Sequence, residues 1–146
     1  MDNMMKIKML LPLIAFGLVG CTSVRVTPLA KTEAINRICI QKNDAVKVSD
    51  LLPVVQQRLT YHHIQSVVFN GERPDNCPYI MNYTARRTWD VVPYLSSAEF
   101  SINRDGVIIA SAEFHLRAGG GLSLMKWRGT DYKINPVIDR LVGASD

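Results

Sequence analysis

Alternating apolar and polar residues in the second half of the chain predict a run of antiparallel strands. The alternation covers residues 79–89, 98–102 and 107–116, and a period of two is typical of strands with one buried and one exposed face. Polar residues 103–106, which end in Gly106, separate the last two stretches and predict a tight turn. Residues 98–116 are therefore expected to form a β-hairpin.

Two other stretches carry the spacing of amphipathic helices. Apolar residues fall on one helical face from Leu51 to His62, after Ser49 as the predicted N-cap, and again from Ile134 to Leu141. Short runs at 37–41 and 66–69, rich in β-branched residues, predict two more strands. The expected order is β-α-β-β-β-β-α. This order indicates an α+β fold, in which a mostly antiparallel sheet of about four to five strands carries two helices on one face.

The first twenty residues have the pattern of an export signal. Lys6 and Lys8 precede an apolar run from Met9 to Val19. A helix of that length rises roughly 16 Å, about half the thickness of the hydrocarbon core of a bilayer, so a permanent membrane span is not expected.

The end of this segment, Leu18-Val19-Gly20-Cys21, resembles the lipobox of bacterial lipoproteins. The resemblance implies that residues 1–20 are removed and that Cys21 carries a diacylglyceryl group and an N-terminal acyl chain such as palmitate. Thr22 stands where an Asp would favour the inner membrane, which implies the outer membrane and a domain that faces the periplasm. An ordinary signal peptide that precedes an unmodified cysteine is the alternative.

The exported chain is expected to form a single domain behind a tether. Residues 21–34 carry the lipidated cysteine and no strong period, and Pro28 disfavours a central strand, so they are expected to form a tether that could end in a short edge strand. Residues 35–146 form the predicted α+β domain. Its layout and the ending at residues 133–143 resemble small uncharacterised α/β lipoproteins of Gram-negative envelopes, a resemblance that implies no activity.

Two of the three cysteines remain after lipidation of Cys21. Export would place Cys39 and Cys77 in an oxidising compartment, where an even pair is expected to form a disulfide bond. Two reduced thiols are the alternative. A zinc site is disfavoured because no second cysteine or histidine stands at ligand spacing.

The overall charge says little about partners. The chain has 17 basic and 13 acidic residues, a net charge of +4 at pH 7. This excess is small and scattered, which argues against nucleic acid as a partner and leaves only a weak attraction to anionic lipid head groups.

The residue types of catalysis occur without the required geometry. His62 and His63 would point in different directions on a helix, so they cannot share a metal ion. Ser111, Glu113 and His115 would share one strand face at spacings near 7 Å, too far apart for direct hydrogen bonding. The glycines at 119–121 lack the Lys-Ser/Thr of a phosphate-binding loop. No cofactor, no metal and no enzyme activity are expected.

Basic and aromatic residues that gather near the predicted strand ends form the candidate binding surface. They are Arg86, Arg87, Trp89, Lys126, Trp127 and Arg128. Such a set can bind an anionic glycan, a lipid or a partner protein, and it can equally be a solvated sheet edge with core anchors. The hypothesis is a lipid-anchored binding or accessory module. The alternative is a ligand carrier or an envelope enzyme, which would require a deep apolar cavity.

Overall fold

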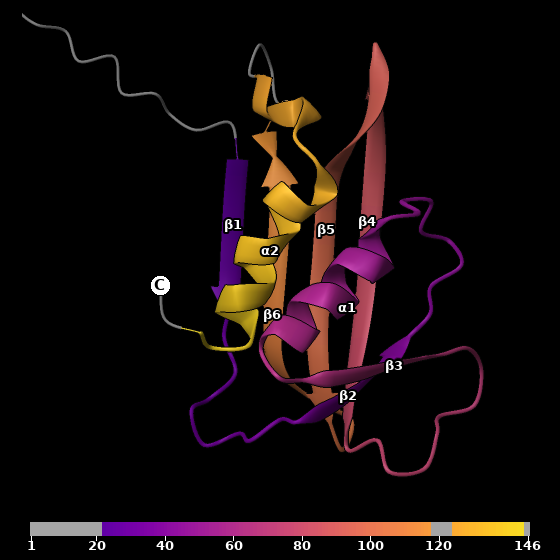
Figure 1. Cartoon of the computed structure of the whole chain (residues 1–146), viewed down its shortest axis with the longest axis vertical. Helices are drawn as coiled ribbons and strands as arrows, with labels where there is room; N and C mark the ends of the chain where they lie inside the picture. Colours follow the sequence, from indigo (N-terminus) through magenta and orange to yellow (C-terminus); the bar gives the residue numbers. More distant parts are fainter. Residues whose placement is uncertain (1–21, 118–123, 145–146) are drawn as a thin grey trace, which may run out of the picture.

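A six-stranded sheet carries two α-helices on one of its faces (Figure 1). The computed structural model describes residues 22–117 and 124–144. The strand order across the sheet is β1-β6-β5-β4-β2-β3, so β1 and β3 are its edges. The elements are β1 (Thr22–Thr27), β2 (Arg37–Gln41), α1 (Leu51–Tyr61), β3 (Gln65–Phe69), β4 (Tyr79–Asp90), β5 (Val92–Arg104), β6 (Val107–Leu116), the 3-10 helix η2 (Leu124–Trp127) and α2 (Thr130–Leu141).

The α+β class is confirmed, but the number and the directions of the strands differ from the prediction. The sheet has six strands rather than four to five. It is mixed, because β2 runs parallel to both β3 and β4 while the other pairs are antiparallel. The parallel pairing of β2 with β3 follows from α1, since a helix between two strands returns the chain to the end of the sheet from which it left. The expected hairpin is confirmed, with Asp105 and Gly106 both at positive φ in its turn.

The predicted tether begins as a strand of the sheet. All six residues of β1 pair antiparallel with β6, from Thr22 opposite Leu116 to Thr27 opposite Ser111. Val24 and Val26 pack against the core. Because an edge strand with one exposed face needs few apolar residues, two valines are sufficient here, and that weak signal allowed only a short edge strand at the end of the tether to be expected.

The hairpin of β4 and β5 extends well past the predicted strand ends. Residues 92–97 lay outside the predicted strands, but they belong to β5, and the single residue Val91 reverses the chain. Pro93 lies opposite Trp89 close to the start of β5, where the missing N–H of proline is tolerated. A bulge between Arg86 and Arg87 separates this extension from the rest of the sheet.

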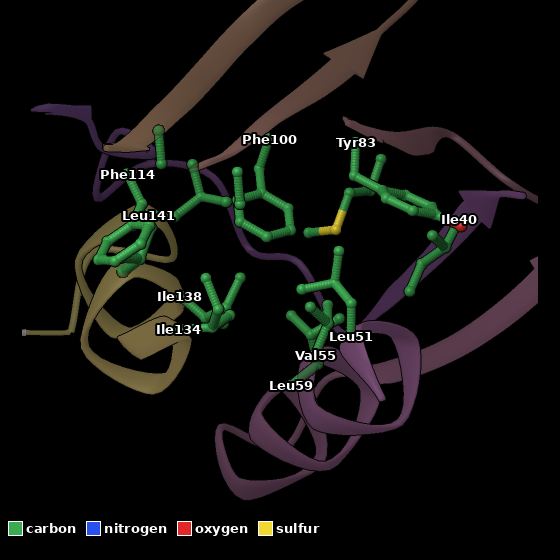
Figure 2. Close-up of a cluster of buried hydrophobic side chains, with 14 of the residues drawn as sticks. Ile40, Leu51, Val55, Leu59, Tyr83, Phe100, Phe114, Ile134, Ile138 and Leu141 are labelled. Atoms are coloured by element: carbon green, nitrogen blue, oxygen red, sulfur yellow. The ribbon is translucent and has the colours of Figure 1, made fainter. Parts of the chain in front are cut away.

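The core fills the space between the sheet and the helices (Figure 2). The buried side chains of α1 recur every fourth residue, at Leu51, Val55 and Leu59, as the helical pattern predicts. The helix begins one residue later than expected, with Asp50 rather than Ser49 at its N-cap. From α2 and the sheet, the core receives Ile134, Val137, Ile138, Leu141, Met81, Phe100 and Phe114.

The predicted disulfide bond between Cys39 and Cys77 is present, with a Cα–Cα distance of 5.8 Å. Cys39 points away from the helices, because its neighbours Ile38 and Ile40 belong to the main core on the other face. The disulfide forms a second, small cluster with Ile80. It therefore fastens the loop before β4 to the back of β2.

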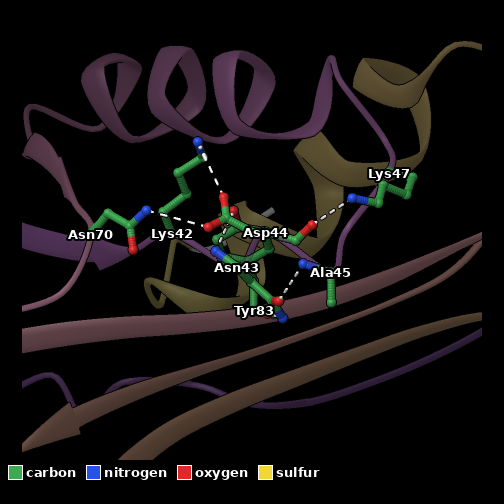
Figure 3. A network of polar contacts seen from close by, with 7 residues as sticks. All are labelled: Lys42, Asn43, Asp44, Ala45, Lys47, Asn70 and Tyr83. Atoms are coloured by element: carbon green, nitrogen blue, oxygen red, sulfur yellow. Dashed lines mark hydrogen bonds and ion pairs between the residues drawn. The ribbon is translucent and has the colours of Figure 1, made fainter.

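Polar contacts hold the connection between β2 and α1 against β4 (Figure 3). The Asn43 side chain donates to the backbone oxygen of Tyr83 at 3.0 Å, and the Asn43 N–H donates to the Tyr83 hydroxyl at 3.1 Å. Lys42 forms an ion pair with Asp44 at 3.2 Å, and that contact is the main cause of a lowered pKa at Asp44. The first turn of α1 is thus positioned beside the β4–β5 hairpin.

Both helices end in the same hydrogen-bonded turn. After α1, the N–H of Ile64 donates to the oxygen of Leu59, and after α2 the N–H of Ala144 donates to the oxygen of Asp139, each at 2.9 Å. This turn requires a left-handed residue. Gly143 fills that place after α2 with φ +78°, and His63 fills it after α1 with φ +60°.

Candidate functional site

The sheet face opposite the helices is lined with polar side chains in three rows that cross four strands. We call these residues of β1, β6, β5 and β4 the open face. Strand by strand in that order, the rows are Arg25, Glu113, Glu99 and Thr84; Ser23, His115, Ser97 and Arg86; and Thr27, Ser111, Ser101 and Asn82.

Glu99 and Glu113 lie directly opposite each other in the middle of the open face. Both are exposed, and like charges in such a cross-strand pair destabilise a sheet. Arg25 of β1 is the next residue in the row, although no ion pair joins it to Glu113 within the part of the chain that the structure describes. The pair therefore lowers the stability of the isolated domain.

An open hollow of about 990 Å³ lies along this face. Small side chains such as Ser97 and Thr84 form part of its lining, and the longer Arg86, Glu113 and His115 border it. The hollow is therefore wide and of mixed polarity. It is suited to another macromolecular surface rather than to a small apolar ligand.

A second surface forms where η2 packs on the end of the β4–β5 hairpin. We call residues 89–92 together with η2 the tip. The Lys126 ammonium pairs with the Asp90 carboxylate and lies 4.5 Å from the centre of the Trp127 ring. The indole N–H of Trp127 donates to the backbone oxygen of Asp90 at 3.1 Å. Asp90 therefore holds η2 against the hairpin through both its carboxylate and its backbone.

Lys133 of α2 connects the tip to the rest of the domain. Its ammonium donates to the backbone oxygens of Leu95, at 3.0 Å, and of Lys126, and it lies 5.4 Å from the centre of the Tyr94 ring. Burial lowers the pKa of Lys133. Since its contacts run to β5 and to η2, the role of this lysine is to position the tip.

The tip exposes apolar side chains to solvent. Trp89 is 72% exposed and Val91 is 77% exposed, and Leu124 is exposed as well. Val91 has a φ of +65°, a left-handed backbone that is a real outlier for a β-branched residue. Strained backbone of this kind clusters at functional sites.

The structure brings the six candidate surface residues to one end of the molecule but divides them between environments. Trp89 and Trp127 belong to the tip, and Arg86 belongs to the open face. Arg87 donates to the backbone oxygen of Lys47 at 3.1 Å, and the Arg128 guanidinium lies 4.7 Å from the centre of the Tyr132 ring. Lys126, expected on the surface, is only 6% exposed. Its ammonium group pairs with the Asp90 carboxylate inside the tip.

The histidines have structural surroundings in the described chain. His62 lies 2.6 Å from the Asp139 carboxylate, which also binds Arg58. His115 shares the open face with Ser111 and Glu113, as the alternation predicts. No group of three histidine, cysteine or acidic residues suited to a metal ion occurs among residues 22–117 and 124–144.

Sequence reasoning missed the apolar part of the tip and the Glu99–Glu113 pair. Val91, Val92 and Leu124 lay outside the predicted elements, and a cross-strand pair becomes visible only with the register of the sheet. A useful signal was present in Trp89 to Pro93, where apolar residues surround one acid between two predicted strands. Cys21 and the glycines at 119–121 lie outside the described residues.

Fold and surface together define an α+β module with one face of its sheet left open. None of the helices described is long and apolar enough to cross a membrane. Comparison with known protein families and with curated proteins finds no match to this sequence.

Solved structures with the same fold include PelC from Paraburkholderia phytofirmans, which forms a dodecamer. One PelC chain aligns with a TM-score of 0.55 at 11% identity, over 84% of this chain and 96% of that one. A variant of PelC in another crystal form aligns with a TM-score of 0.55 at 13% identity, over 84% of this chain and 95% of that one. At such identities the similarity shows a common fold.

Proposed function

We propose that this chain is a lipid-anchored envelope lipoprotein that acts as a non-enzymatic accessory module, with the open face as its contact surface. The observation that carries the proposal is the exposed Glu99–Glu113 pair at the centre of that face. Two carboxylates opposite each other weaken the isolated sheet. A partner that brings basic groups to this face would remove the repulsion between the two carboxylates, and this relief would favour the complex.

The lipid anchor is proposed from the lipobox that ends in Cys21. Its support is the sequence before this residue, in which Lys6 and Lys8 precede the apolar run from Met9 to Val19. The outer membrane, with the domain in the periplasm, is proposed from Thr22 on the same resemblance. Several acyl chains on one cysteine give a stable anchor where one would be marginal.

We also propose that copies of the chain associate with one another. The support is that the PelC chains of the same fold belong to dodecamers. The edges β1 and β3 differ in sequence and lie at opposite sides of the sheet, so a contact of one edge with the other would be head-to-tail. Head-to-tail contacts close into rings when the rotation between copies allows it.

In-cell photo-crosslinking of the full lipidated chain tests the contact surface. Photoreactive residues at Glu99 and Glu113 report on the open face, and one at the exposed Gln57 of α1 is the matched control on the helix side. A recurrent protein adduct from the open face only would support the module. Adducts from Gln57 alone, or no protein adduct from the open face, would reject it.

Native mass spectrometry of the same protein in mild detergent tests the self-association. A ring gives one dominant species at a fixed multiple of the subunit mass, and that species should persist on dilution. A monomer over the whole concentration range would reject the association and leave the open-face contact to the crosslinking result.

The alternative of a ligand carrier rests on one smaller feature. An apolar hollow of about 260 Å³ lies between β1, β6 and α2, with Val24, Leu116 and Val137 in its lining. The rest of the space between the sheet and the helices is filled by buried side chains. A lipid or other ligand that stays bound through native mass spectrometry of the purified protein would support the carrier.

A further inference from the structure

Most of the exposed apolar side chains gather at the end of the molecule where the described chain begins. Ten large hydrophobic side chains are exposed among the residues described, and seven of these ten belong to the tip or to the first turn of α2. The seven are Trp89, Val91, Val92, Leu124, Met125, Trp127 and Tyr132. Singly such residues are ordinary, but a group at one end indicates a contact with an apolar or interfacial environment.

The register of the sheet places this group beside the predicted anchor. Thr22 pairs with Leu116, one residue beyond the row in which His115, Ser97 and Arg86 lie side by side. The first residue of β1 is therefore level with the bulge of β4, and the hairpin continues for four residues of β4 beyond it, roughly 13 Å along the strand. Figure 1 shows the start of β1, η2 and the end of the hairpin at the same end of the molecule.

Basic side chains surround the apolar group. Arg87 and Arg128 lie beside the tip, Arg86 lies next to them on the open face, just before the bulge, and all three are exposed. Asp90 is already paired with Lys126. Asp50 and Asp131 are exposed acids at this end, so the three arginines leave an excess of one positive charge. Arginines behind a layer of tryptophan and aliphatic side chains match the phosphates and the interfacial region of a phospholipid layer.

We propose that the tip rests in the headgroup region of the membrane that holds the Cys21 anchor. In this arrangement Trp89 and Trp127 lie at the interface, and Arg86, Arg87 and Arg128 contact lipid phosphates. The inference rests on the proposed lipid anchor and adds the orientation of the domain. A second, weak contact beside the acyl chains fixes the sheet relative to the membrane, where the anchor alone would leave it free to turn. The strained Val91 then has a function, because it places an apolar side chain at the outermost point of the hairpin.

The chain offers a direct probe, since Trp89 and Trp127 are its two tryptophans. The full lipidated protein is reconstituted into vesicles of zwitterionic and anionic phospholipid, with or without lipids brominated high on their acyl chains. We expect a blue-shifted emission that brominated lipid quenches and that aqueous iodide leaves largely intact. Trp89→Phe and Trp127→Phe each leave one tryptophan, which should retain this behaviour.

A reporter at the other end of the molecule is the matched control. Val107 is exposed at the turn between β5 and β6, so Val107→Trp combined with Trp89→Phe and Trp127→Phe moves the only indole away from the tip. Its emission should be red-shifted, open to iodide and insensitive to brominated lipid. The same variant should float with the vesicles, which shows that the anchor is intact.

Two results would overturn the inference, and they are distinguishable. Native tryptophans that are quenched by iodide but not by brominated lipid, in a protein that is acylated and floats, would reject the orientation alone. A protein whose N-terminal peptide carries no acyl group and which does not float would reject the proposed anchor together with the orientation.

Discussion

The carboxylate of Asp139 accepts hydrogen bonds from Arg58 Nε at 2.5 Å and from Arg58 Nη2 at 2.6 Å. This two-point contact joins α2 to α1 close to the C-terminal ends of both helices. His62 adds a third contact to the same carboxylate, at 2.6 Å. The side chains are partly buried, so the contact stabilises the packing of the helices more than a fully exposed ion pair would.

Asp139→Asn should destabilise the fold at neutral pH and remove part of its acid sensitivity. Hydrogen bonds from Arg58 are the main cause of the lowered pKa of Asp139, whose ordinary value is 3.8. Because the pKa of Asp139 is lower in the folded state, the charged carboxylate stabilises the fold fully at pH values above its ordinary pKa. This stabilisation is lost as the pH falls through the pKa of the folded state. We expect a loss of about 1 kcal/mol in the free energy of unfolding at pH 7.

Urea unfolding at pH 7 and at pH 3 checks this prediction. The difference between wild type and Asp139→Asn should narrow at the lower pH. Asp75→Asn, in an exposed loop, is the control and should have little effect at pH 7. Equal destabilisation by Asp139→Asn at both values would show that the carboxylate charge is not what matters.

Removal of the disulfide bond should lower the free energy of unfolding of the domain. The bond joins residues 38 apart in sequence, and the chain-entropy relation gives an upper value of about 4 kcal/mol for a loop of that length. Cys39→Ala combined with Cys77→Ala should lower the urea midpoint accordingly. A reducing agent should lower the midpoint of the wild type and leave that of the double variant unchanged. A reductant effect on both proteins would point to another cause.

Glu99→Gln should stabilise the isolated domain while it weakens the contact that the open face makes. Removal of one charge ends the repulsion with Glu113 across the strands and should raise the free energy of unfolding by about 0.5 kcal/mol. Thermal or urea unfolding of the purified domain measures the first effect, and the yield of the open-face crosslink in cells measures the second. Glu72→Gln, exposed in a loop, should change neither. A destabilised Glu99→Gln variant would show that the glutamates are paired within the fold.

Val91→Gly and His63→Gly should both stabilise the chain, and only the first should change how the tip meets lipid. Each variant replaces a residue of positive φ by glycine, which adopts this backbone without strain. Glycine also has more conformational freedom in the unfolded chain, which offsets part of the gain. We expect a net increase of about 0.5 kcal/mol in the free energy of unfolding. In vesicles, Val91→Gly should reduce quenching by brominated lipid, whereas His63→Gly, distant at the end of α1, should not. A similar loss of quenching in both variants would reject the role given to Val91.

Local patterns were sufficient for the elements that form from neighbouring residues. The hairpin of β5 and β6 was predictable because alternation on both sides of Asp105-Gly106 specifies strands and turn together. The buried faces of both helices followed from their spacing, and the disulfide from the cysteine count and the expected compartment.

The rest depended on partners that lie far apart along the chain. The parallel pairing of β2 with β4 joins segments that no local pattern connects, and the repulsion of Glu99 and Glu113 exists only in the observed register. Lys126 looked like a surface residue because its acid partner, Asp90, lies 36 residues away. The hairpin extension was missed because a valine at positive φ and a proline near a strand start are both unusual there.

The start of β1 immediately after Cys21 also has a mechanical consequence. In a chain anchored at Cys21 as proposed, a pull on the acyl chains would act along β1, and the six residue pairs between β1 and β6 would resist it together in shear rather than opening one after another. Force on the envelope would then pass into the sheet instead of being absorbed by a slack linker. The edge strand would thus be a rigid coupling between the membrane and whatever the module holds.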